Sequence, residues 1–385
     1  MVRYTFARTA VAALLAAGLM TGGAVAQDDP VKVGVIFPLS GGAGPQGEHV
    51  NWAIEAMAEM INEDGGVMDR QIEILSRDDE STPAVGVSRA NELISEGVDV
   101  IIEGWNSPVT LAMQPVIARA GIMDITAISK ADPILSGEGN PMAVRLNSSN
   151  AQDGTVIAKF ISDAGAKRIA FLTENDAYGT GAQASIEAAL TDMGYDYEKV
   201  AEELFPFDQA DFRVQLSNVK SANPDITIAI NANEGLGMPA IIRQASRSRL
   251  PGQLVAAVGT VAPSVIEVAG DAANGLVGAD IYFPAVEPFA SNEMNQRFIT
   301  TTQELHDYTP DKFMALAATA LQVWAMAANE VGSLDKTAIA ERIRGGSFDG
   351  TILGDVTFGD NGQLNSNHYV FDVTDQKIVV RQAAN

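Results

Sequence analysis

A chain of 385 residues is long enough to form two α/β lobes, each with its own hydrophobic core. Its 49 acidic residues outnumber the 25 basic ones, and the net charge of −24 argues against nucleic acid or an anionic lipid surface as a partner. The chain has no cysteine, which excludes disulfide bonds and a lipid anchor on a processed N-terminal cysteine.

Residues 1–26 have the pattern of a secretory signal peptide. Arg3 and Arg8 come before or at the edge of an apolar run over residues 10–20, and the small residues Ala24-Val25-Ala26 follow it. The run is shorter than the ~20 apolar residues of a transmembrane helix, so a membrane anchor is the less favoured alternative. We expect cleavage after Ala26 and export to the periplasm.

Residues 31–82 predict a strand, a glycine-rich turn, an amphipathic helix and a second strand. The continuous apolar run from Val31 to Phe37 suits a strand buried on both faces. Apolar residues recur at helical spacing from Trp52 to Ile61, and Gly65-Gly66 ends that helix. Such a βαβ unit implies a parallel sheet with its ligand site at the carboxyl ends of the strands.

The rest of the chain continues this alternation of strands and helices. Strands are predicted at residues 98–103, 122–128, 168–173, 226–231 and 254–258. Helices are predicted at residues 83–96, 109–120, 292–306, 311–330 and 337–344. Residues 351–358 and 369–380 alternate like antiparallel strands around a turn at 360–362. The pattern predicts a doubly wound α/β protein.

Six stretches, spread over nearly the whole chain, resemble a known family. They are PLSGGAGPQG, INEDGGVMDRQIEILSRDDEST, GVDVIIEGWNSPVTLAMQPVIARAGI, AKRIAFLTENDAYGTGAQ, DFRVQLSNVKSANPDITIAI and GGSFDGTILGDVTFGDNGQ. In this order and spacing they resemble the periplasmic Leu/Ile/Val-binding family, the type I solute-binding proteins of ABC transporters.

The resemblance implies two doubly wound, Rossmann-like lobes joined by a three-segment hinge. Lobe one would comprise residues 28–148 and 281–350, and lobe two residues 149–280 and 351–385. The implied function is to close on a small polar solute, with a branched-chain or other amino acid favoured, and to deliver it to the ABC permease. We expect a monomer that is not an enzyme.

Lobe one offers candidate ligand-binding residues in three loops. Ser107, at the end of the strand 98–103, has a hydroxyl and a helix-start amide that suit a carboxylate, although these features also suit a plain N-cap. By resemblance, Ser107 grips the ligand carboxylate, with Asn106 beside it, and Trp105 and Gln46 shape the side-chain pocket. In the loop after residues 122–128, the family's hydroxyl position falls on Ser129 or Lys130. Ser129 is preferred for the hydroxyl, and Lys130 is either a solvated charge or an anion ligand.

Lobe two offers candidates at three strand ends. By resemblance, Tyr178 in Asp176-Ala177-Tyr178-Gly179 covers the ligand from across the cleft. The family's acidic partner for a ligand ammonium is missing at Thr260, and Glu234 is the acid at a neighbouring strand end that could replace it or point to solvent.

Other site chemistries are weakly supported or absent. The segment 42–47 matches G-x-G-x-x-G, but Pro45 removes an amide that could face a pyrophosphate, so the glycines are interpreted as a cleft loop and no cofactor is expected. The three histidines lack metal-ligand spacing, and there is no nucleophile elbow. Two alternative functions stay open: a receptor for an aromatic acid or a short amide such as urea, and a sensor module for a membrane receptor.

Overall fold

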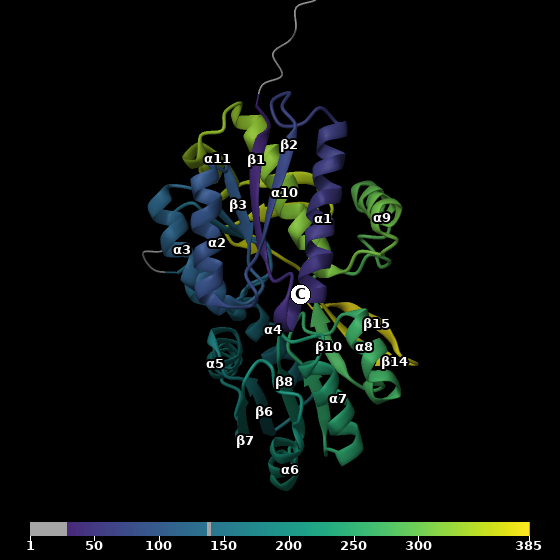
Figure 1. The fold of residues 1–385 in the computed structure, drawn as a ribbon. Helices are drawn as coiled ribbons and strands as arrows, with labels where there is room; N and C mark the ends of the chain where they lie inside the picture. Colours follow the sequence, from purple (N-terminus) through teal and green to yellow (C-terminus); the bar gives the residue numbers. More distant parts are fainter. Residues whose placement is uncertain (1–28, 137–139, 385) are drawn as a thin grey trace, which may run out of the picture.

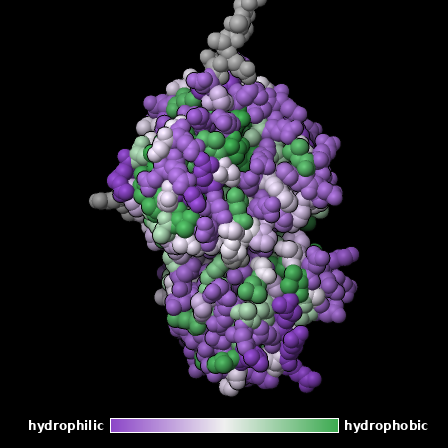
Figure 2. Space-filling view, viewed as in Figure 1, coloured by the Kyte–Doolittle hydropathy of each residue, from purple (hydrophilic) through white to green (hydrophobic). Residues whose placement is uncertain are grey.

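The computed structural model describes residues 29–136 and 140–384. It consists of two lobes, each built on a sheet with helices on its faces (Figure 1). The predicted signal peptide, residues 1–26, lies outside the described residues. Within the described ranges, no helix combines the length and the apolar character needed to cross a membrane. The visible face of both lobes is mainly hydrophilic (Figure 2).

The first lobe contains a parallel sheet with the strand order β2-β1-β3-β4-β5. The order reverses direction at β1, which makes the sheet doubly wound. Its strands are β1 (Val31–Phe37), β2 (Ile72–Asp78), β3 (Val100–Glu103), β4 (Met123–Thr126) and β5 (Ala143–Arg145). The crossover helices are α1 (Gly44–Glu63), α2 (Pro83–Glu96) and α3 (Ser107–Ala120).

Helix α1 begins earlier than the sequence pattern predicted. We expected the helix from Trp52, but it starts at Gly44, with Pro45 in its first turn, where a missing N–H costs nothing. A glycine is required at position 47, because a Cβ there would lie 1.8 Å from the carbonyl oxygen of Pro38. The glycines thus let the first turn of α1 pack directly on the chain leaving β1.

The chain returns to the first lobe after the second lobe is built. Helix α10 is buried along almost its whole length and fills the face of the sheet next to α1. The returning elements are α9 (Glu293–His306), α10 (Lys312–Val331), α11 (Lys336–Ile343), β11 (Ser347–Thr351), β12 (Gly354–Phe358) and β13 (Leu364–Asn365).

The small sheet β11-β12-β13 corrects the predicted lobe boundary. Ile352, Val356, Phe358 and Leu364 are buried in the same hydrophobic core as β1 and α10. Burial of these side chains keeps residues 351–365 on the first lobe, whereas the sequence division assigned them to the second.

The second lobe contains a seven-stranded sheet with the order β15-β14-β10-β9-β8-β6-β7. Strands β10, β9, β8, β6 and β7 run parallel, and β14 and β15 join them antiparallel, as the alternating tail predicted. The strands are β6 (Arg168–Glu174), β7 (Glu198–Phe205), β8 (Ile226–Ile230), β9 (Gln253–Ala256), β10 (Val277–Asp280), β14 (His368–Thr374) and β15 (Lys377–Ala384). The helices are α4 (Asn150–Asp163), α5 (Ala177–Asp192), α6 (Arg213–Ala222), α7 (Gly237–Ser248) and α8 (Pro263–Ala269).

Three chain crossings connect the lobes, near residues 147–150, 281–284 and 365–368. Side-chain amides tie two of them together: Gln363 Nε2 donates to the Asn147 carbonyl at 2.8 Å, and Gln152 Nε2 donates to the Leu364 carbonyl at 3.2 Å. Segments distant in sequence therefore form one hinge, and a hinge of parallel connections permits closure of the lobes around a ligand.

Two buried carboxyls within the first sheet, Glu103 on β3 and Asp124 on β4, make folding stability dependent on pH. Burial raises the pKa of Asp124 to about 7, and burial together with Asp124 raises the pKa of Glu103 well above its usual value. A raised carboxyl pKa means that stability is complete below about pH 4 and is lost as pH rises through the folded-state pKa. Asp124→Asn should therefore gain about 2–4 kcal/mol relative to the wild type between pH 4 and pH 7.

Denaturant unfolding at several pH values measures this gain. The matched control is Asp163→Asn, an exposed residue whose difference from wild type should stay within about 0.5 kcal/mol. A difference between Asp124→Asn and wild type that does not change with pH would contradict the prediction.

Candidate functional site

A pocket lies between the lobes, at the carboxyl ends of their strands. The first lobe contributes Trp105, Asn106, Ser107, Ile128, Lys130, Asn147 and Phe313. The second contributes Glu174, Asp176, Tyr178, Ala232, Glu234, Gly259 and Thr260. The pocket has a volume of about 420 Å³, which suits a small ligand rather than an oligosaccharide.

Ser107 is positioned to donate a hydrogen bond into this pocket. It is the first residue of α3, and its Oγ accepts the backbone N–H groups of Lys130 and Ala131, both at 3.2 Å. Because these two donors occupy the oxygen, the hydroxyl hydrogen remains for an acceptor in the pocket. The N-terminus of α3 adds its positive dipole end, and the combination suits a carboxylate.

Aromatic rings form the apolar wall of the first lobe. The rings of Trp105 and Phe313 lie 4.7 Å apart between centroids, and both residues are buried. Asn106 is the N-cap residue of α3 and lines the pocket beside them. This wall can pack against the apolar part of a ligand.

The structure reverses the expected positions of Ser129 and Lys130: Lys130 lines the pocket, and Ser129 does not. The Ser129 hydroxyl lies 2.9 Å from Thr110 Oγ1 in the interior of the first lobe, and Ser129 is not among the residues that line the pocket. Lys130 lines the pocket instead, and it is buried rather than solvated. The hydroxyl of this loop therefore belongs to the core.

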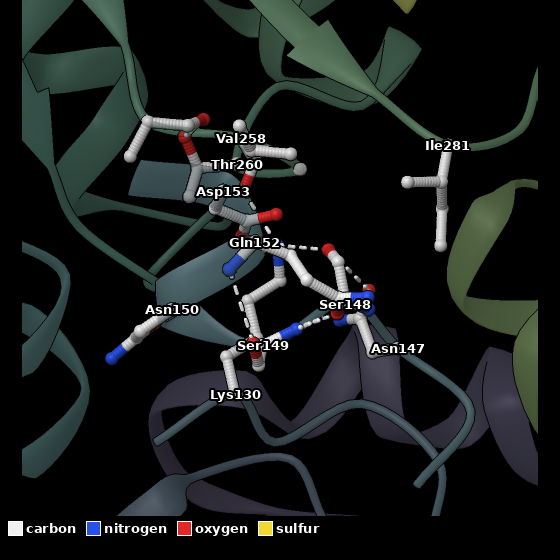
Figure 3. Close-up of polar contacts among 12 residues, drawn as sticks. Lys130, Asn147, Ser148, Ser149, Asn150, Gln152, Asp153, Val258, Thr260 and Ile281 are labelled. Atoms are coloured by element: carbon white, nitrogen blue, oxygen red, sulfur yellow. Dashed lines mark hydrogen bonds and ion pairs between the residues drawn. The ribbon is translucent and has the colours of Figure 1, made fainter. Parts of the chain in front are cut away.

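The buried ammonium of Lys130 connects the two lobes (Figure 3). Its Nζ lies 2.6 Å from Asp153 Oδ2 and donates to the Val258 carbonyl at 2.9 Å. Burial opposes ionisation of Asp153, but Lys130 and His368 outweigh it and lower the pKa of Asp153 to about 2. Asp153 is thus ionised at neutral pH, whereas burial lowers the pKa of Lys130 against the opposing effect of Asp153.

Lys312 makes a second connection of the same kind. It is the first residue of α10 in lobe one, and its Nζ donates to the Gly259 carbonyl of lobe two at 2.8 Å. Asp280 Oδ1 lies 3.6 Å from this ammonium. Both lysines therefore bond to consecutive carbonyls, Val258 and Gly259, in the loop after β9.

Glu234 faces the pocket with its carboxyl unbonded. The side chain is 4% exposed, and neither of its oxygens has a hydrogen-bond partner among the described residues. Burial raises the pKa of Glu234 well above its usual value, against the opposing effect of Lys312. Of the two readings that the sequence left open, the structure places Glu234 in the pocket and not in solvent.

Glu174, Asp176 and Tyr178 form the adjoining part of the lobe-two wall. Tyr178 is buried in the first turn of α5 and lines the pocket, and its place over a ligand stays a prediction. Glu174 ends β6, and Asp176 is the N-cap of α5, with its Oδ1 accepting the Gly179 N–H at 2.8 Å. The sequence reading did not select Glu174 or Asp176, although both follow the predicted strand 168–173 directly.

Gln46 and Thr260 contribute less to the pocket than the sequence predicted. Gln46 does not line the pocket; it reaches across the cleft to Gly235, where an added Cβ would lie 3.3 Å from Gln46 Nε2. Thr260 lines the pocket, but its hydroxyl donates to the Ala257 carbonyl at 2.8 Å. Gln46 therefore contacts lobe two outside the pocket. Thr260 lines the pocket, but its hydroxyl hydrogen is not available to a ligand.

Comparison with known proteins agrees with this geometry. The family model described as "Periplasmic binding protein" matches residues 30–377. This chain belongs to the periplasmic binding protein family. The Leu/Ile/Val-binding protein homolog 1 of Brucella abortus (strain 2308) is 26% identical to this periplasmic binding protein over 357 residues, which cover 92% of the chain and 93% of the relative.

Solved structures show the same fold. A leucine binding protein from Thermotoga maritima has a TM-score of 0.80 and 25% identity, covering 92% of this periplasmic binding protein and 99% of that chain. A solute binding protein of an ABC transporter from R. palustris, in complex with benzoate, has a TM-score of 0.82 and 24% identity, covering 92% and 96%. The predicted fold class of two doubly wound lobes is thus confirmed.

Proposed function

We propose that this protein captures an α-amino acid in the periplasm and delivers it to the transmembrane subunits of an ABC importer. The observation that carries the proposal is the polarity of the pocket: a hydroxyl and a helix N-terminus on lobe one face the buried, unbonded carboxyl of Glu234 on lobe two. An α-amino acid has the complementary charges, a carboxylate and an ammonium, on one carbon.

The carboxylate end would lie on Ser107. A carboxylate there accepts the Ser107 hydroxyl hydrogen and the Ser107 backbone N–H without displacing any bond that Ser107 already makes. The other amides of this turn are not available, since Pro108 has no N–H and Val109 and Thr110 donate to the Asn106 carbonyl. Lys130 lies beside this position and contributes positive potential, while its own hydrogen bonds go to lobe two.

The ammonium end would lie on Glu234. A buried ammonium needs a charged partner, because an unpaired charge in a water-poor cleft costs several kcal/mol. Glu234 has two unbonded oxygens in the pocket, and an arriving ammonium would favour its ionised form. The two charges of the ligand thus bridge the two lobes, and binding favours the closed state.

The comparisons support an amino acid as the ligand but do not identify which amino acid it is. The Brucella relative and the Thermotoga structure are named for Leu/Ile/Val and for leucine. A benzoate-like acid is the second candidate, supported by the aromatic pair Trp105–Phe313 and by the benzoate complex of the R. palustris protein. It is the weaker candidate, because a benzoate would leave Glu234 without a partner.

Replacing Ser107 by alanine tests the carboxylate position. Ser107→Ala should weaken binding of the ligand by about 1.5–3 kcal/mol, the range for a hydrogen bond to a charged group. Calorimetry with the amino acid that co-purifies, identified by mass spectrometry, measures the change. Ser221→Ala, an exposed serine on α6 that bonds only its own helix, serves as the control. Unchanged affinity in Ser107→Ala would remove Ser107 from the site and the carboxylate from the proposal.

A further inference from the structure

The lobe-two wall of the pocket carries a second acidic position besides Glu234. Glu174 and Asp176 both line the pocket, and they come from the end of β6 and the start of α5, whereas Glu234 comes from the loop after β8. One ligand ammonium paired with Glu234 leaves this second position without an assigned role.

Only one of the two oxygens of the Glu174 carboxyl accepts hydrogen bonds. Its Oε2 accepts the Ala232 N–H at 2.8 Å and the Asn231 side-chain amide at 3.1 Å. Its Oε1 has no hydrogen-bond partner among the described residues, although Glu174 is fully buried. In the ionised form of Glu174 this fixed, buried oxygen would need a donor, and an ordered ligand group can supply it.

The surroundings of Glu174 and Glu234 differ in charge. Lys312 and Lys130 act on Glu234, whereas the charged neighbour that acts most on Glu174 is another acid, Asp176. In residues 29–136 and 140–384, no lysine, arginine or histidine forms an ion pair with Glu174 or Asp176. Burial and Asp176 raise the pKa of Glu174 to about 9, so Glu174 keeps its proton at neutral pH until an N–H donating group in the pocket favours the ionised form.

We propose that Glu174 and Asp176 form a subsite for a second N–H donating group, so that the ligand is an α-amino acid whose short side chain ends in an amine, guanidinium or amide. The proposal rests on the proposed function, because Ser107 and Glu234 hold the α-carboxylate and α-ammonium. An aliphatic side chain would leave Glu174 Oε1 unsatisfied, and sites built to bond a polar group discriminate strongly against analogues that lack it.

Isosteric ligands test this subsite on the mature protein. L-ornithine and L-norleucine have side chains of equal length that end in an ammonium and a methyl group, and L-glutamine ends in an amide. Calorimetry should show that ornithine or glutamine binds at least about tenfold more tightly than norleucine. Glu174→Gln should reduce this preference to about twofold.

Two further variants keep the test decisive. Glu304→Gln, an exposed residue of α9, should leave all three affinities unchanged. If circular dichroism shows that Glu174→Gln does not fold, Asp176→Asn replaces it, because asparagine also caps a helix.

The outcomes separate the subsite from the proposed function. Norleucine binding as tightly as ornithine and glutamine, or a preference that survives both substitutions, would overturn the subsite while leaving an amino-acid receptor in place. No binding of any α-amino acid, including norleucine, would overturn the proposed function itself.

Discussion

Replacing Glu234 by glutamine is expected to weaken binding of an α-amino acid at least tenfold, or about 1.4 kcal/mol. The substitution removes the carboxylate that pairs with the ligand ammonium while keeping the size of the side chain. The fold should be retained, since burial raises the pKa of Glu234 well above its usual value and neither of its oxygens has a hydrogen-bond partner among the described residues.

Calorimetry at pH 7 measures this effect, and Glu304→Gln is the matched control. A ligand without an ammonium should bind to Glu234→Gln at least as tightly as to the wild type, because it makes no ion pair with this carboxyl. An amino acid bound equally well by the wild type and by Glu234→Gln would disprove the assignment of the ammonium to Glu234.

Replacing Lys130 by methionine should lower the free energy of unfolding by about 3–5 kcal/mol. The reason is the buried pair with Asp153: its side chains are 6% and 9% exposed, and removal of the ammonium leaves a carboxylate without its strongest partner. His368 still contacts Asp153 at 2.9 Å, which favours the lower end of this range.

Denaturant unfolding with two companion variants measures the contribution of the pair. Lys159→Met breaks an exposed pair with Asp163 and should cost less than about 0.5 kcal/mol. The double variant Lys130→Met/Asp153→Asn should recover part of the loss, since it removes the stranded charge. A loss in Lys130→Met no larger than that in Lys159→Met would show that the buried pair contributes little.

The pattern of the sequence predicted the fold well because its signals are local. Continuous apolar runs mark the buried parallel strands, and helical spacing marks helices such as α10 within one residue of either end. The start of α1 was misjudged because Gly47 is selected by a close approach to Pro38, a contact between segments that periodicity does not report.

The site was only partly predictable, because side-chain direction depends on tertiary packing. Loop position placed Trp105, Ser107, Tyr178 and Glu234 correctly at strand ends. Ser129 and Lys130 are neighbours in one loop, and only the packing of Ser129 against Thr110 decides which of them enters the pocket. Lys312 was missed because a lysine at a helix start is normally solvent-exposed, and its burial results from closure of lobe two over it.

The bonds from Lys130 and Lys312 to the loop after β9 separate affinity from selectivity in this receptor. They join protein groups on both sides of the cleft, so they stabilise the closed conformer equally for every solute. Apparent affinity scales with the fraction of molecules already in the binding-competent conformer. The part of the lysines' effect that acts through these interlobe bonds would therefore shift the affinities of all solutes by one common factor, whereas changes at Glu174 or Glu234 would alter their order. Evolution can therefore change the overall affinity of such a receptor without changing which solute it prefers.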